Sequence, residues 1–418
     1  MCLAADAPAP EPIPFRQAVE MALQHSGIMS IATINQWRAF KGYQEVRANY
    51  IPQITIGSGL GYSYGFPLTL EGSAPSVANF TSVQSLFNLS LQQFIKAARI
   101  DWKATSIDIE DKRNAVILDT ALSYAQLDQL TSKLGVLNQG QAAAEKAQSV
   151  TEQRLQEGVD SQLDLTKSQL VAARIRLRIA EAQAQADVLR EHLSRLLGVP
   201  AESIAVDPGS VPQLPAISQD VDIVTRAVST SPTVRLAQQK LDAAQARAKG
   251  EHRASWPTVD VATQYAYLAR FNNYDVYYRK YLANNFSGGL NIRIPIFNSI
   301  QKAKAEQADA DVQLAQKQAE LARNQVSENA LKLQRSLRQL AAARDVAKLE
   351  WQVAQGDLDA VKARTETGNA NTREQQNAQL DLQDKYAAYL DAEFELSRAE
   401  LQILRLTGEL QNWAIPPR

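Results

Sequence analysis

The sequence is poor in several features that mark common protein classes. Its only cysteine is Cys2, so neither an intrachain disulfide framework nor a cysteine-based metal cluster can form. The 44 lysines and arginines nearly balance the 45 aspartates and glutamates, which leaves no strong field to attract nucleic acid or acidic lipid. No run approaches the roughly 20 apolar residues of a membrane-spanning helix, so a bilayer crossing would need strands.

Residues that could carry chemistry are also scarce. The three histidines, His25, His192 and His252, lie far apart in the sequence and lack the spacing of metal ligands. The sequence contains no glycine-rich phosphate loop and no nucleophile motif. We therefore expect no catalytic residue, no bound metal and no cofactor, and we do not expect an enzyme.

Two long stretches without proline indicate long helices, because proline breaks helix interiors. One lies between Pro75 and Pro200 and the other between Pro295 and Pro416. Both are rich in the strong helix formers Ala, Gln, Leu, Glu, Lys and Arg. A helix that fills half of such a stretch is roughly 90 Å long, which exceeds an ordinary globular domain.

A glycine near the middle of each stretch, Gly158 or Gly368, suits the end of one helix. Ser161 and Asn371 can then cap a second helix, so each stretch is predicted to be an antiparallel hairpin. Leucines in the first stretch recur with coiled-coil spacing at Leu127, Leu130, Leu134, Leu137, Leu163, Leu170 and Leu177.

The chain also contains an internal repeat, which usually defines the architecture. When the sequence is slid along itself, matching residues include Ala22 with Ala227, Ser26 with Ser231, Pro52 with Pro257, Gly158 with Gly368, and Gly198 with Gly408. We predict two tandem copies of one unit, each with a short helix, two β-strands and a very long helical hairpin.

Four segments alternate apolar and polar residues with period two, which predicts strands at about 52–66, 80–94, 257–270 and 284–296. The polar positions, expected to line a water-filled lumen, are Gln53, Gln84, Asn88, Asp260, Gln264, Asn291 and Arg293. Such alternation is typical of transmembrane β-barrels, although the edge of a soluble sandwich alternates identically. Aromatic residues at strand ends and loops favour the barrel, as in an interfacial belt: Tyr62, Tyr64, Tyr265, Tyr267, Phe271, Tyr274, Tyr277, Tyr278, Tyr281 and Phe286.

Four strands cannot close a barrel alone, since about eight are needed before a tilted sheet encloses an interior. Unpaired strand edges in lipid are costly, so symmetry-related copies must supply the missing strands. The expected layout is a Pro-rich tether at 1–14, a first repeat at 15–199 with its hairpin at about 97–197, a linker at 200–217, a second repeat at 218–409 with its hairpin at about 299–408, and a tail at 410–418. The short helices are expected at about 15–46 and 220–250.

This layout resembles the TolC family of outer-membrane efflux proteins over nearly the whole chain. The motifs that carry the resemblance are Arg154-x-x-x-Gly158, Arg364-x-x-x-Gly368, Leu163-Asp164-Leu165, Leu196-Leu197-Gly198, Leu406-Thr407-Gly408 and Pro295-Ile296-Phe297-Asn298. The resemblance implies a homotrimer with a twelve-stranded β-barrel on a twelve-helix α-barrel. Such a trimer lies in the outer membrane of a Gram-negative-type bacterium, contacts its lipid and projects into the periplasm.

The implied role is a passive exit duct, joined through a periplasmic adaptor protein to an inner-membrane pump, in tripartite efflux or type I secretion. The alternative is a periplasmic coiled-coil adaptor or structural protein, which also uses long helical hairpins. The twofold repeat and the four alternating segments disfavour that alternative.

The resemblance also implies that Asp164 and Glu374, which follow the two tip glycines, face a narrowed periplasmic mouth. The alternative is that both acids cap helices, since acidic residues favour helix N-termini. Arg154 and Arg364 lie in the last turn before each tip, where they either complement the helix dipole or pair across helices or with the adaptor. The aromatic and basic gate partners of the family are replaced in the second tip, so its closing network does not transfer.

Cys2 stands directly before a proline-rich run, as the acylated cysteine does in mature bacterial lipoproteins. This position matches the lipidated branch of the family, and Cys2 is a candidate for lipidation. Met1 departs from that pattern, because a lipoprotein precursor carries a signal peptide before its cysteine. The alternative is an accidental free thiol on a disordered tail.

Overall fold

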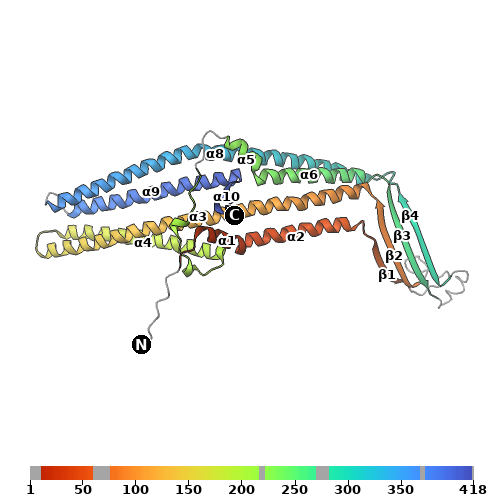
Figure 1. Ribbon diagram of the computed structural model, residues 1–418, viewed down its shortest axis with the longest axis horizontal. Helices are drawn as coiled ribbons and strands as arrows, with labels where there is room; N and C mark the ends of the chain where they lie inside the picture. Colours follow the sequence, from red (N-terminus) through yellow and green to blue (C-terminus); the bar gives the residue numbers. More distant parts are fainter. Residues whose placement is uncertain (1–10, 60–75, 216–221, 270–281, 368–371, 417–418) are drawn as a thin grey trace, which may run out of the picture. The chain divides into compact units, whose positions relative to one another are not determined.

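In a computed structural model, the chain forms two compact units, and the structure describes residues 11–59, 76–215, 222–269, 282–367 and 372–416 (Figure 1). The tip unit comprises Met1–Ala32, Ile109–Val234 and Arg323–Arg418. The sheet unit comprises Thr33–Asp108 and Arg235–Ala322. Two helices of equal length contribute residues to both units, α3 (Leu89–Gln156) and α8 (Ser299–Glu366).

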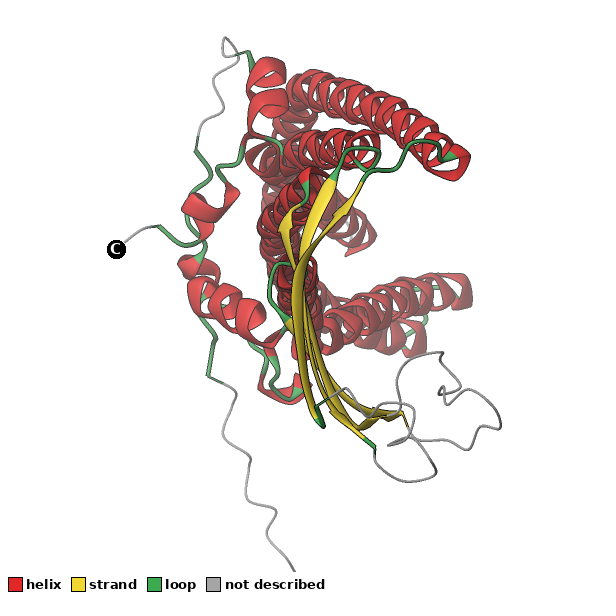
Figure 2. Ribbon diagram, turned by 90° about the vertical axis from the view of Figure 1, so that its right-hand side faces the viewer, coloured by secondary structure: helices red, strands yellow, loops and turns green. Residues whose placement is uncertain are grey.

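The sheet unit contains a four-stranded antiparallel sheet in the order β1-β2-β3-β4. The strands are β1 (Gln53–Gly59), β2 (Ser76–Phe87), β3 (Thr258–Leu268) and β4 (Asn284–Arg293). Figure 2 shows them as one curved layer. The unit also holds most of α2 (Gly27–Ala48) and of α6 (Pro232–Arg253).

The second strand ends earlier than its alternation suggested. We expected a strand over about 80–94, but β2 ends at Phe87 and α3 begins at Leu89. The reason is a helix cap, because the side-chain oxygen of Asn88 accepts a hydrogen bond from the Leu91 amide at 2.9 Å. The leucines after Asn88 therefore belong to a helix.

Each predicted short helix is divided in two by an extended residue. The first consists of α1 (Phe15–His25) and α2, separated at Ser26, whose ψ is 125°. The second consists of α5 (Ile223–Thr230) and α6, separated at Ser231, whose ψ is 122°. Pro232 follows Ser231, and a residue before proline is pushed out of the helical region.

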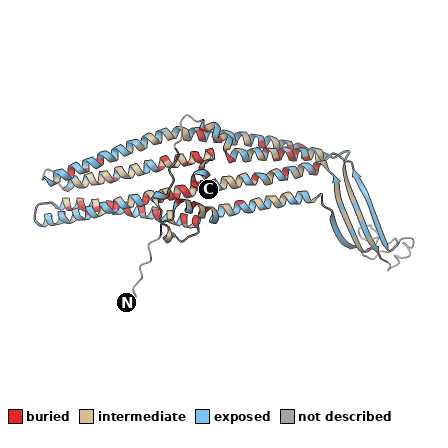
Figure 3. Ribbon diagram, in the orientation of Figure 1, coloured by how far each residue is buried: buried red, intermediate tan, exposed pale blue. Residues whose placement is uncertain are grey.

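In the tip unit, α4 (Gln162–Leu197) follows the end of α3 and α9 (Thr372–Thr407) follows the end of α8, so each pair forms a hairpin. The linker after α4 forms two short 3-10 helices, Ala201–Ser203 and Pro208–Ser210. The predicted tail contains α10 (Leu410–Ala414), whose end residues are buried. Figure 3 shows buried segments alternating with exposed and intermediate ones along the long helices.

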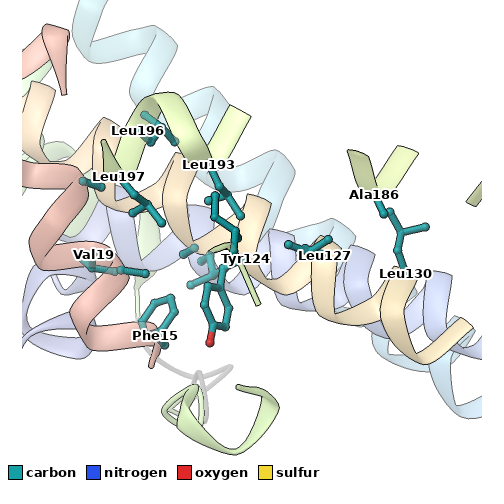
Figure 4. Packing of buried hydrophobic residues seen from close by; sticks show 14 of the residues in the cluster. Phe15, Val19, Tyr124, Leu127, Leu130, Ala186, Leu193, Leu196 and Leu197 are labelled. Carbon is teal, nitrogen blue, oxygen red and sulfur yellow. The ribbon is translucent and has the colours of Figure 1, made fainter. Parts of the chain in front are cut away.

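The largest core cluster lies between α1, α3 and α4, around Phe15, Tyr124, Leu193 and Leu197 (Figure 4). The predicted leucine stripe divides here. Leu127, Leu130 and Leu137 are at most 5% exposed, whereas Leu163, Leu170 and Leu177 on α4 are 60%, 49% and 59% exposed. The exposed leucines form an apolar stripe on α4 that no described part of the chain covers.

Candidate functional site: an amphipathic sheet and two hairpin tips

One face of the sheet is polar, and the strand register defines it. Asp260 lies opposite Asn291, and Gln264 lies opposite Ser287. Directly opposed residues share a face of an antiparallel sheet. The hydroxyls of two further residues on this face, Thr55 and Thr81, are 2.5 Å apart. The face also carries two further predicted lumen residues, Gln53 and Arg293.

The other face of the sheet is apolar. Val261 lies opposite Leu290, and Val259 lies opposite Ile292. The rings of Phe80 and Tyr265 are 6.0 Å apart on this face. Large side chains there are well exposed: Ile54 70%, Ile56 71%, Phe286 74%, Leu290 66% and Ile292 61%. An apolar surface of this kind calls for an apolar environment, which the described residues do not provide.

Two residues predicted to line the lumen, Gln84 and Asn88, do not lie on the polar face of the sheet. Gln84 lies opposite Val261 on the apolar face, where its amide donates a hydrogen bond to the Tyr50 carbonyl at 3.2 Å. Val83 takes the polar-face position opposite Gln53 instead. The strand register of β2 shifts between Ser85 and Phe87, so Phe87 and Gln84 share the apolar face although the alternation of the sequence places them on opposite faces. Asn88 is the cap of α3 and belongs to no strand.

The sheet has two outer edges. Among the described strands, β1 pairs only with β2, and β4 pairs only with β3. The outer backbone groups of β1 and β4 are therefore available to further strands.

The first hairpin tip ends α3 with a tight reversal at Gly158, whose φ is 77°. The Gly158 amide donates to the Leu155 carbonyl at 3.0 Å, and the Val159 amide donates to the Arg154 carbonyl at 2.8 Å. This is the paired hydrogen-bond pattern of a Schellman motif, which favours glycine because φ is positive. The Arg154 guanidinium pairs with Asp160 at 3.0 Å, rather than with Asp164.

Asp164 forms a capping box with Ser161 at the start of α4. The Asp164 amide donates to the Ser161 hydroxyl at 3.2 Å, and the Asp164 carboxylate accepts from the Ser161 amide at 3.2 Å. Hydrogen bonds from the Ser161 hydroxyl and amide lower the pKa of Asp164, and the charges of Lys167 and Arg373 lower it further. Arg373 is the second residue of α9, so a charge of the second hairpin acts on the first tip.

The second tip brings together the other two gate candidates. The Arg364 guanidinium and the Glu374 carboxylate are 3.9 Å apart, and Glu374 lies in the first turn of α9. Gly368 and Asn371 lie outside the described residues, as does Cys2. Sequence reasoning missed Asp160 and Arg373, although Arg373 directly precedes Glu374 and could have been noticed as a first-turn cation.

Several predicted aromatic residues also lie outside the described ranges: Tyr62, Tyr64, Phe271, Tyr274, Tyr277, Tyr278 and Tyr281. Within the described ranges, no group of three or more His, Cys, Asp or Glu side chains is placed to hold a metal ion. None of the helices in the described part of the chain is long and apolar enough to cross a membrane.

Solved structures of outer-membrane channel proteins share the fold of this chain. VceC of Vibrio cholerae matches with a TM-score of 0.75 at 17% identity, over 94% of this chain and 96% of VceC. CusC, whose structures concern transmembrane channel formation, matches with a TM-score of 0.75 at 18% identity, over 97% of this chain and 95% of CusC. The family model for outer membrane efflux proteins matches residues 18–199 and 223–409.

This chain therefore belongs to the outer membrane efflux protein family, and the resemblance inferred from the sequence is confirmed. Among characterised relatives, protein CyaE of Bordetella pertussis is 25% identical over 422 residues, which cover 96% of this chain and 86% of CyaE.

Proposed function

We propose that the protein is a subunit of a homotrimeric channel in the bacterial outer membrane, and that it serves as the passive exit duct of a tripartite efflux pump or a type I secretion system. The observation that carries the proposal is the division of the sheet into one polar and one apolar face. In a closed barrel the apolar face meets lipid and the polar face meets water.

A trimer accounts for the features that one chain leaves incomplete. The free edges of β1 and β4 pair with those of neighbouring copies, so that three four-stranded sheets close a twelve-stranded barrel. The two hairpins of each chain, whose helices match in length, supply four helices to a twelve-helix tunnel. The exposed leucine stripe on α4 packs against a neighbouring copy. A stable monomer or dimer in mild detergent, measured by mass, contradicts this arrangement.

The tips form the periplasmic end of the duct, where an adaptor protein connects it to an inner-membrane pump. Asp164, in the capping box of α4, and Glu374, in the first turn of α9, also close the mouth. The charge of Arg373 acts on Asp164 of the other hairpin, which supports a mouth held by attraction between the two hairpins of a chain, whereas Arg364 pairs with Glu374 within the second hairpin. The pump sets the cargo, because a passive duct selects little. Lipidation of Cys2 adds a second anchor, and mass analysis of the mature N-terminus from the native gene tests it.

Two adjacent residues of β4 provide the sharpest test of the barrel. Leu290 lies on the apolar face and Asn291 on the polar face, so Leu290→Lys and Asn291→Lys place the same charge on opposite faces. Lysine on the lipid face near the bilayer midplane costs about 2 to 4 kcal/mol. We expect Leu290→Lys to abolish or sharply reduce heat-resistant trimer in the outer membrane, and Asn291→Lys to assemble normally and alter ion selectivity. Equal effects of the two variants contradict the assignment of faces.

A further inference from the structure

Four consecutive residues of α9, which we call the α9 node, each contact a neighbouring helix, and together they reach three of them. Gln383 packs on Gly140 of α3. Asp384 pairs with Arg178 of α4. On α8, the Lys385 ammonium pairs with Glu350 at 2.9 Å, and the ring of Tyr386 lies 5.3 Å from that of Trp351. At the node, α9 is therefore held both to α8, its partner in the second hairpin, and to α3 and α4 of the first hairpin.

The contact between Gln383 and Gly140 is unusually close. Gln383 is 3% exposed, and its amide nitrogen lies 1.6 Å from the position that a Cβ on Gly140 would occupy. Only glycine lets α3 and the side chain of α9 approach in this way.

The amide of Gln383 is also unsatisfied. Neither its nitrogen nor its oxygen has a hydrogen-bond partner among the described residues, and both atoms are out of contact with solvent. The assignment of the two amide atoms does not matter here, since both are unpartnered. Burying an amide without hydrogen-bond partners costs free energy. The contact between Gln383 and Gly140 therefore stabilises the packing of α9 on α3 less than its close fit suggests.

A cavity of about 250 Å³ lies beside the node and offers space for the amide of Gln383. It is bounded by α3, α4 and α9, and Gln383 is one of its lining residues. Arg178, Glu181 and Gln185 of α4 also line it. If the Gln383 side chain turned into this space, it would gain polar partners that it lacks against Gly140.

We propose that the α9 node is a pivot in the tip unit, at which the tip-side part of α9 separates from α3 when Gln383 leaves Gly140 for the adjoining cavity. Beyond the node, α9 stays attached to α3, through Asp391 with Gln129 at 2.6 Å and Arg405 with Asp111 at 3.3 Å. The tip side of α9 also carries Arg373, whose charge acts on Asp164, so a movement about the pivot changes the separation of these two charges.

Two glycines of α3 give a matched pair of variants. Gly140→Ala collides with Gln383, whereas a Cβ on Gly135 meets nothing within 4 Å. Both substitutions raise the helix propensity of α3 by the same amount. We expect Gly140→Ala to accelerate hydrogen exchange of the α9 amides on the tip side of the node by about tenfold, in the full-length assembled protein. Gly135→Ala is expected to leave it unchanged.

A second pair of variants tests the amide itself. Gln383→Met keeps the length of the side chain and removes its polar atoms, so we expect exchange on the tip side to slow by about tenfold. The double variant Gly140→Ala with Gln383→Ala relieves the collision and should restore exchange to within about twofold of the wild-type rate. The pivot is refuted if Gly140→Ala behaves like Gly135→Ala, or if Gln383→Met accelerates exchange as Gly140→Ala does.

Only the link between the pivot and conductance rests on the proposed function. We expect Gly140→Ala to raise, and Gln383→Met to lower, the fraction of time that single channels spend open in planar bilayers. Wild-type protein that forms no channel counts against the proposed function, while the exchange comparison still decides the pivot. Wild-type protein that conducts, with exchange unchanged in both node variants, refutes the pivot and leaves the duct intact.

Discussion

The hydroxyl of Tyr124 fastens the segment before α1 and the linker after α4 to the core of the tip unit. The side chain is 2% exposed, and its ring meets that of Phe15 edge-on at 5.5 Å (Figure 4). The hydroxyl donates to the Ile13 carbonyl at 2.7 Å and accepts from the Asp207 amide at 2.7 Å. Tyr124 thus joins segments that are distant in the sequence.

Tyr124→Phe removes this hydroxyl and keeps the ring. The Ile13 carbonyl and the Asp207 amide each lose a partner, whereas the Ser210 hydroxyl keeps its bonds to the Phe15 amide at 2.8 Å and the Asp207 carbonyl at 2.7 Å. Two lost hydrogen bonds of about 0.5 to 1.5 kcal/mol each predict a loss of about 1 to 3 kcal/mol. The loss should appear first as local release of the linker.

Hydrogen exchange at the amides of Ile13 and Asp207 measures this release, and denaturant unfolding measures the global effect. Tyr386→Phe is the matched control, because the Tyr386 hydroxyl has no hydrogen-bond partner in the part of the chain that the structure describes. We expect tenfold or greater acceleration at Ile13 and Asp207 in Tyr124→Phe, and no change there in Tyr386→Phe.

Alkaline pH gives an independent measurement. Burial raises the pKa of Tyr124 above its usual value, which is about 10. Stability that depends on the neutral phenol is therefore complete below pH of about 10 and is lost as the pH rises through the folded-state pKa. Tyr124→Phe should lose less stability than wild type on going from neutral to strongly alkaline pH. If Tyr124→Phe matches wild type in exchange and in pH dependence, the hydroxyl does not fasten these segments.

Two further predictions concern carboxylates. Burial, followed by repulsion from Glu393, raises the pKa of Asp128, so its charge opposes folding above the unfolded-state pKa. Asp128→Asn should raise the melting temperature at pH 7 and have little effect near pH 3, and equal gains at both values would show that charge is not the cause. Replacing Asp164 and Glu374 together by Ala should raise channel conductance with only a modest fall in thermal stability. If the double variant conducts like wild type and only its melting temperature falls, these two acids act as helix caps alone.

The sequence by itself determined the elements of this protein. Proline-free stretches of helix formers predicted both hairpins, and the glycine at Gly158 marked the first tip, because a positive φ there excludes most other residues. Period-two alternation located all four strands, since one face of each strand differs from the other in polarity. These signals are local, and each is readable within a few turns or a few residues.

Only the tertiary structure decided which residues face each other. The face of Gln84 depends on how β2 pairs with its neighbours, because the register shifts between Ser85 and Phe87 and reverses the alternation that Phe87 indicates. Likewise, nothing in the spacing of the leucines distinguished buried Leu127 from exposed Leu163. The contact between Gly140 and Gln383 joins helices of different hairpins, so no local pattern reveals it. Such contacts depend on how distant segments pack, and a single sequence carries no periodic signal for them.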